Sequence, residues 1–172
     1  MKNLILGIIL GLIFVGAGAF VYFRFGFAPV ATAAQPMPFE KTLANYALNA
    51  RVAKEAPKTV PIGADAANLM AGAHVYVENC AMCHGLPENR TAMFRDGMFP
   101  HPPQLFHGKG VTDDPAGETY WKVTNGIRMT GMASFGRMLD DTQSWQVSLL
   151  LAKADKLPLD VRTYLQTKPM EK

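Results

Sequence analysis

The sequence predicts an all-α protein in which an N-terminal transmembrane helix precedes one helical domain. Three observations support this fold class. They are a run of twenty apolar residues near the N-terminus, later segments whose apolar residues recur at helical spacing, and the absence of an alternating segment long enough for a strand. With 172 residues the chain has room for one modest domain plus an extra segment, so its length excludes a large multidomain enzyme.

The apolar run covers residues 4–23 and lies between Lys2 and Arg24. At a rise of about 1.5 Å per residue, a helix of this length crosses the hydrocarbon core of a bilayer, which is ~30 Å thick. A cleaved secretory signal is the alternative, because residues 31–33 read Ala-Thr-Ala, an A-x-A cleavage pattern. The apolar part of a signal is usually only ~7 to 15 residues long. We therefore expect residues 1–27 to form a retained transmembrane anchor.

Residues 28–64 form the predicted linker between the anchor and the main domain. Their first part is rich in Pro and Ala and has no periodicity. A short amphipathic helix follows and is expected to end near Pro57. Its apolar stripe must pack on the domain that follows or on a neighbouring subunit. The stripe consists of Phe39, Leu43, Tyr46, Ala47 and Ala50.

The predicted main domain, residues 65–172, consists of helices around a long loop. The loop, from Gly85 to Thr112, is rich in Pro and Gly, and a loop of this length inside a compact domain is generally functional. Sequence signals for helix caps set the expected bounds of the helices. One helix follows Asp65, one runs from Asp114-Pro115 to Asn125-Gly126, one opens at Asp140 or Asp141 with Gln143 in a capping box and ends before Pro158, and a short one covers residues 159–166.

Residues 80–84 read Cys-Ala-Met-Cys-His, the C-x-x-C-H pattern of covalent haem attachment. The spacing has a physical reason. At a helix end, Cys80 and Cys83 are three residues apart and can each add to one vinyl group of the porphyrin, while the adjacent His84 presents its imidazole to the iron. The chain has no other cysteines, so the motif predicts a single covalent haem c.

Other uses of these side chains remain open at this point. Cys80 and Cys83 with His101 and His107 have the spacing of a structural zinc site. The two cysteines alone would also suit a redox dithiol, which needs a βαβ setting, or a plain disulfide.

A second axial ligand decides what a haem does, because two protein ligands close the iron to substrates and leave electron transfer. Three methionines lie between the predicted second and third helices of the main domain, where a loop can fold over the opposite haem face. They are Met129, Met132 and Met138.

Several segments together resemble a small membrane-anchored monohaem class I cytochrome c, nearest to the cbb3-type and dehydrogenase-associated cytochrome c domains. They are Gly72–Tyr76 ahead of CAMCHG, PHPPQL, YWKVTNGIRMTGMASFG and the helix from Asp140 that carries Trp145. The resemblance covers roughly residues 65–156. It implies a class I cytochrome c domain wrapped around one haem, with the Met of T-G-M, Met132, as the distal ligand. The family usually has Pro after this Met, and this chain has Ala133.

The resemblance also implies three contacts within the domain. Gly72 lets the first and last helices cross closely, and Tyr76 packs near Trp145 and Leu149. A backbone carbonyl near Pro102 or Pro103 accepts the Nδ1 proton of His84.

The expected function is one-electron transfer between respiratory, photosynthetic or dehydrogenase partners, with no catalytic residues. Haem attachment occurs on the outer side of the bacterial inner membrane, so we expect a single-pass anchor with the haem domain in the periplasm. The expected partners are redox proteins at this membrane, reached as a tethered carrier or as a fixed subunit of a complex. The alternatives are a haem peroxidase or ligand sensor with an open distal site, and a zinc-stabilised assembly subunit.

The net charge gives no reason to expect a nucleic-acid partner. The chain carries 17 basic and 14 acidic residues, a net charge of +3. Without Lys2 and Arg24, which flank the anchor, 15 basic and 14 acidic residues remain, so the exported part is +1. Electrostatic docking of a partner must therefore come from local patches of charge.

Overall fold

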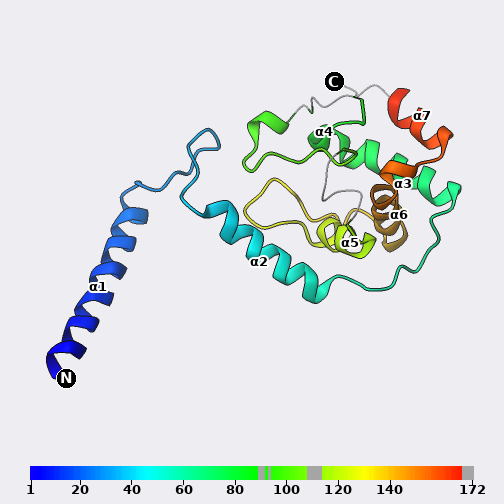
Figure 1. Cartoon of the computed structure of the whole chain (residues 1–172). Helices are drawn as coiled ribbons and strands as arrows, with labels where there is room; N and C mark the ends of the chain where they lie inside the picture. The colour runs from blue at the N-terminus through cyan, green and yellow to red at the C-terminus, as the bar shows by residue number, and fades with distance from the viewer. Residues whose placement is uncertain (89–91, 93, 108–113, 168–172) are drawn as a thin grey trace. The chain divides into compact units, whose positions relative to one another are not determined.

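The computed structural model of the chain describes residues 1–88, 92, 94–107 and 114–167 (Figure 1). All the regular elements of these residues are helical, which confirms the predicted all-α class. By internal contacts the chain divides into two units, Met1–Leu43 and Ala44–Lys172. The helices are α1 (Lys2–Arg24), α2 (Glu40–Glu55), α3 (Ala66–Asn79), α4 (Ala81–His84), α5 (Ala116–Asn125), α6 (Asp141–Ala152) and α7 (Leu159–Thr167), with 3-10 turns η1 (Arg95–Gly97) and η2 (Ala154–Lys156).

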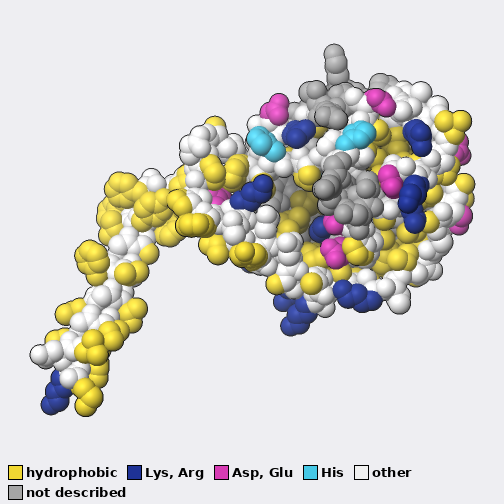
Figure 2. Space-filling view, viewed as in Figure 1, with side chains coloured by type: hydrophobic (Ala, Val, Ile, Leu, Met, Phe, Trp, Pro, Cys, Tyr) yellow, Lys and Arg dark blue, Asp and Glu magenta, His cyan; other side chains and the backbone are white. Residues whose placement is uncertain are grey.

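Helix α1 is the predicted membrane-spanning segment. Its mean hydropathy is 2.7, and none of its residues is buried by the rest of the protein. Figure 2 shows hydrophobic side chains along its length. Among the described residues it is the one helix long and apolar enough to cross a membrane. Its length and composition are those of a membrane-crossing helix, and an N-terminal signal sequence meets the same criteria.

The core of the second unit forms where α3 crosses α6, with α5 packed on α6 and α7 packed on α3. Gly72 of α3 lies directly against the backbone of Gln146 in α6, and a Cβ atom at this position would collide with the Gln146 carbonyl group. This close crossing confirms the role expected for Gly72. Tyr76 and Trp145 are both in this core, but their ring partners are others: Tyr76 meets Phe106 edge-on at 4.9 Å between centroids, and Trp145 stacks on Tyr120 at 4.2 Å.

The helix caps follow the sequence signals with one exception. The Asp65 side chain accepts a hydrogen bond from the backbone N–H of Asn68, and Asp140 and Gln143 form the complete capping box of α6. At α5, however, Pro115 and not Asp114 occupies the N-cap position. Asp114 instead forms an ion pair with Lys122, with 3.1 Å between Oδ2 and Nζ. Asp114 was expected to be the N-cap of α5 and is not; its carboxylate pairs with Lys122, about two turns into the helix.

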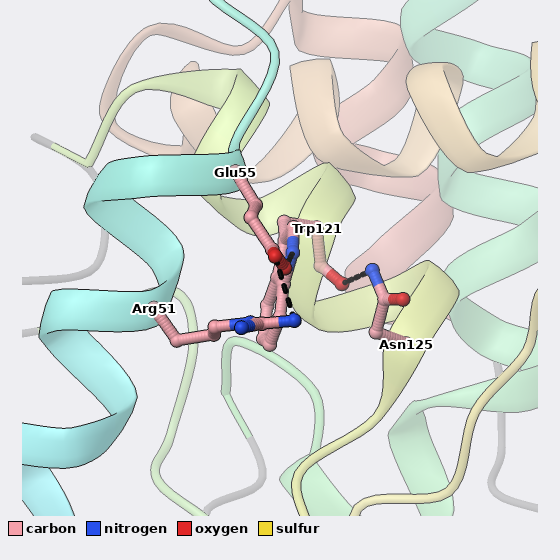
Figure 3. A network of polar contacts seen from close by, with 4 residues as sticks. All are labelled: Arg51, Glu55, Trp121 and Asn125. Carbon is pink, nitrogen blue, oxygen red and sulfur yellow. Dashed lines mark hydrogen bonds and ion pairs between the residues drawn. The ribbon is translucent and has the colours of Figure 1, made fainter.

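Within the second unit, the C-terminal half of α2 packs on the domain that contains the C-x-x-C-H motif. Val52 is 2% exposed and Ala56 5% exposed. Glu55 connects α2 to α5, because the indole Nε1–H of Trp121 donates to its carboxylate at 3.2 Å while Arg51 pairs with the same carboxylate at 2.7 Å (Figure 3). The predicted helix is therefore present, but its predicted stripe is not the docked face: Tyr46 is 71% exposed.

Candidate haem-binding site

The C-x-x-C-H motif lies at the junction of α3 and α4. Cys80 ends α3, where its backbone N–H donates to the Tyr76 carbonyl at 2.8 Å, and also begins the single turn of α4. Gly85 ends α4 with a φ of 78°, which a residue with a Cβ atom rarely adopts. The buried hydroxyl of Tyr76 donates to the Gly85 carbonyl at 2.6 Å. The turn that carries both cysteines and the histidine is thus connected to the core at both ends.

His84 has one committed ring nitrogen and one free for a ligand. Its Nδ1 lies 2.7 Å from the carbonyl oxygen of Pro103. A carbonyl only accepts, so Nδ1 carries the proton and the Nε2 lone pair is left for a metal. The expected contact between His84 and a carbonyl near Pro102 or Pro103 is confirmed. Burial lowers the pKa of His84, an effect that the bond to Pro103 partly opposes, which favours the neutral imidazole needed for ligation.

The segment that supplies the Pro103 carbonyl is itself held in place. The Gln104 side-chain amide donates to the Leu86 carbonyl at 3.0 Å, and its oxygen accepts from the backbone N–H of Phe106. Phe106 is buried against Tyr76. Gln104 lies in the PHPPQL segment, which carries part of the family resemblance, whereas no pattern in the sequence indicated a role for Phe106, the residue after it.

Cys80 and Cys83 both carry free thiols, so the site holds no disulfide. Burial, and then the neighbouring Cys83, raise the pKa of Cys80 to about 12. Burial also raises the pKa of Cys83. Both sulfurs are therefore protonated at neutral pH when no group is bound to them.

The zinc alternative is not assembled in the structure. The Nδ1 of His101 lies 2.9 Å from the Arg95 carbonyl, and the Nε2 of His107 lies 2.7 Å from the Pro87 carbonyl. One nitrogen of each ring is thus a donor to backbone, and the other nitrogen of each ring is left over, as in His84. No group of three or more His, Cys, Asp or Glu side chains suited to a metal occurs in the part of the chain that the structure describes.

The T-G-M segment forms a tight loop after α5. Helix α5 ends at Gly126, whose φ is 67°. Beyond it, the backbone N–H of Ile127 donates to the Met132 carbonyl at 3.0 Å, and the N–H of Met132 donates to the Thr130 hydroxyl at 3.1 Å. The same hydroxyl donates to the Ile127 carbonyl at 2.7 Å. The Thr130 hydroxyl therefore holds the backbone of Met132 next to that of Ile127.

The three methionines near this loop differ in burial. Met132 is partly buried and packs on the core that contains Tyr76 and Trp145. Met129 is 93% exposed and has a positive φ of 60°, and Met138 is 67% exposed. A fourth thioether, which no sequence motif singles out, lies beside the loop. A Cβ atom on Gly131 would stand 2.8 Å from the sulfur of the partly buried Met98.

The donor set of these residues fits a covalent haem c. Two free thiols three residues apart, an adjacent imidazole with one uncommitted nitrogen, and a partly buried thioether are the groups that attach a porphyrin and ligate its iron. Hard oxygen donors, which Mg²⁺ or Ca²⁺ would need, take no part in this set.

The family comparison agrees with this chemistry. Residues 67–149 match the family described as cytochrome c oxidase, cbb3-type, subunit III. No curated protein and no solved structure matches the chain. The matched residues run from α3 into α6, so they contain the attachment motif, the Pro103 segment and the T-G-M loop. The region from residue 67 to residue 149 is therefore a class I cytochrome c domain, the class that holds haem c covalently and transfers electrons through it.

Proposed function

We propose that the chain is a membrane-tethered periplasmic electron carrier with one covalent haem c. Cys80 and Cys83 form its two thioethers, and His84 and Met132 are its axial ligands. The observation that carries this proposal is the bond from His84 Nδ1 to the Pro103 carbonyl, because it leaves Nε2 available on the residue that follows Cys83 in α4. His101 and His107 also bond to backbone carbonyls, but only His84 directly follows a cysteine of the attachment motif.

Each residue of the site has a separate task in this proposal. Cys80 and Cys83 would hold the porphyrin covalently, and the Pro103 carbonyl orients the His84 ring and increases its basicity. Haem c supplies a one-electron iron couple when bound. The thioether of Met132, as an iron ligand, would favour the ferrous state and so raise the reduction potential, and it would leave no open position for a substrate. No side chain is required as an acid or base, so we propose no enzymatic step at this site.

The location follows from α1 and from the chemistry of attachment. A retained α1 would cross the bacterial inner membrane once, with residues 28–172 in the periplasm where cysteines are joined to haem. Redox proteins in or at this membrane are the proposed partners, in a respiratory chain or a dehydrogenase complex. Docking of α2 on its own domain through Val52 and Ala56 leaves fewer residues as free tether, which favours a domain held near the membrane.

The decisive experiment compares Met132→Ala with Met129→Ala in the haem-loaded protein. Met132→Ala should abolish the sulfur-to-iron charge-transfer band of the oxidised protein and lower its reduction potential, because the thioether is lost. Met129→Ala should leave both unchanged, since Met129 is 93% exposed. Visible spectra and a potentiometric titration measure the two quantities.

Other outcomes point to other functions. If Met132→Ala keeps the band while Met98→Ala or Met129→Ala loses it, the distal assignment to Met132 is wrong. If the unmodified protein binds CO or peroxide readily and has no such band, the distal site is open and the peroxidase or sensor alternative replaces electron transfer.

A further inference from the structure

Helix α2 (Glu40–Glu55) has two apolar faces, and only one of them is used by the described structure. The inner face carries Val52 at 2% exposure, followed by Ala56 at 5% exposure just beyond the helix. Successive residues of an α-helix turn by about 100°, which places Leu43 and Ala50 about 120 to 180° around the helix from Val52 and Ala56, with Tyr46 beside them at about 120° from Val52. We call this second set the outer stripe. Leu43 is 65% exposed and Tyr46 is 71% exposed.

The inner contacts fix which way the outer stripe faces. Pro57, two residues after α2, lies with its carbonyl against Gly117 of α5, where any Cβ atom would collide with it. Glu55 accepts the hydrogen bond of the Trp121 indole at 3.2 Å and pairs with Arg51 (Figure 3). Because α2 is held on this side, rotation of the helix to bury its outer stripe on the same domain would break all these contacts. The stripe needs an external occupant.

We propose that the outer stripe lies on the surface of the membrane that α1 enters. This inference rests on α1 being a retained anchor. Residues 28–38 join the anchor region to the start of α2, and eleven residues reach at most about 40 Å when fully extended. A turn within them, where Ala34 N–H donates to the Ala31 carbonyl, shortens this reach. The bilayer is therefore the apolar phase that the stripe meets at the highest effective concentration.

The chemistry of the stripe suits an interface. Tyr is enriched at the level of lipid headgroups because its ring is apolar and its hydroxyl is wet. Lys54 continues the stripe one turn beyond Ala50 and provides a cation for anionic phosphates. A second copy of the chain fits less well. Helix α2 has 16 residues, about two heptads, whereas a coiled-coil seam needs about three to four.

As a consequence, the haem domain would contact the bilayer surface through α2. One face of α2 holds the domain and the other holds the membrane, so the domain would present the same side to every partner embedded beside it. This deepens the proposed function, because it favours a carrier of fixed orientation over a freely swinging one.

The test uses the full-length, haem-loaded chain in vesicles of phosphatidylethanolamine and phosphatidylglycerol. Ala50→Cys places a thiol on the outer stripe, and Asn45→Cys places one on an exposed position of the opposite side. A charged, membrane-impermeant maleimide is added, and mass spectrometry follows each site separately. Rates are normalised to those of the same chains unfolded in urea. The Ala50→Cys rate should be several-fold slower than the Asn45→Cys rate, and Leu43→Gln with Tyr46→Gln should remove most of this difference.

A photoactivatable lipid identifies the occupant. Its acyl-chain diazirine should cross-link to the peptide that contains Leu43 and Tyr46, and not to the peptide of α7. Equal maleimide rates at the two positions would overturn the proposal. Chain-to-chain cross-links without lipid adducts would replace it by a second copy, and protection found only in native membranes would replace it by a protein partner. Co-flotation of the unmodified chain with vesicles tests the anchor by itself, so a failed anchor and an unoccupied stripe give different results.

Discussion

The two sides of the candidate haem site are built in different ways. On the attachment side, the turn with Cys80, Cys83 and His84 joins the core through Tyr76, whose buried hydroxyl holds the Gly85 carbonyl, and through Pro103. On the other side, the T-G-M loop of residues 130–132 is held by the Thr130 hydroxyl and by two backbone bonds, both of them to Ile127. Strain or mutation should therefore release the methionine long before it releases the histidine, and each prediction below tests this difference.

The largest effect is expected from removal of the attachment thiols. Cys80→Ser together with Cys83→Ser should abolish covalently bound haem, because neither side chain can then form a thioether. Haem staining of a denaturing gel measures this directly. Met82→Ala is the matched control, since Met82 lies between the two cysteines and is 47% exposed. Haem that stayed attached to the double variant would refute the C-x-x-C-H interpretation.

The next effect concerns the core beneath the attachment side. Gly72→Ala should destabilise the fold by about 2 kcal/mol, because the new methyl group must displace the Gln146 backbone of α6. Guanidinium unfolding followed by circular dichroism gives the change. Gly97→Ala is the control, because nothing lies within 4 Å of its Cβ position, and it should change stability by less than ~0.5 kcal/mol. Equal effects of the two variants would show that α3 and α6 do not cross at Gly72.

The same comparison explains what the sequence reveals. Local signals predicted the attachment side well. The C-x-x-C-H spacing is contiguous, the caps at Asp65 and Asp140 depend on residues three positions away, and the apolar run of α1 is a matter of length. Each of these features is decided within a few residues, so a pattern is sufficient to find it.

Features that depend on distant residues were not predictable in this way. The contact of Met98 with Gly131 joins two loops, and the Trp121–Glu55 bond joins residues 66 positions apart. The face of α2 that packs on the domain was also not predicted. The sequence pattern favoured the larger apolar side chains of Leu43 and Tyr46, whereas the residues that are buried are the smaller Val52 and Ala56. The buried side also depends on a distant contact: the Pro57 carbonyl lies against Gly117, where a residue with a Cβ atom would collide with it.

The methionine loop should respond to the loss of one hydroxyl. Thr130→Val removes both the donor to Ile127 and the acceptor for Met132 N–H, at a cost of about 1 kcal/mol. The sulfur-to-iron charge-transfer band should disappear at a lower temperature than in the unmodified protein, while haem stays attached. Thr163→Val on α7 removes a similar bond, to Leu159 at 2.8 Å, and should leave the band unchanged. If both variants lost the band together, the loop would be no weaker than the rest of the fold.

The smallest effect is expected at the base of the loop, where Tyr120 of α5 stacks on Trp145 and donates a hydrogen bond to Asp141 of α6. This bond is the main cause that raises the pKa of Tyr120 from 10.0 to about 12. A raised pKa means that folding favours the protonated phenol. The bond therefore stabilises the fold fully below pH 10, and its contribution is lost as the pH rises toward 12.

Guanidinium unfolding measures this effect. The free energy of unfolding of the unmodified protein should fall over this pH interval, and that of Tyr120→Phe should fall less. Tyr46→Phe is the control, because Tyr46 is exposed, and it should behave as the unmodified protein does. If Tyr120→Phe matched the unmodified protein at every pH, the bond to Asp141 would contribute nothing to holding α5, and the weakness of the loop would begin beyond Gly126 and not in the helix that carries it.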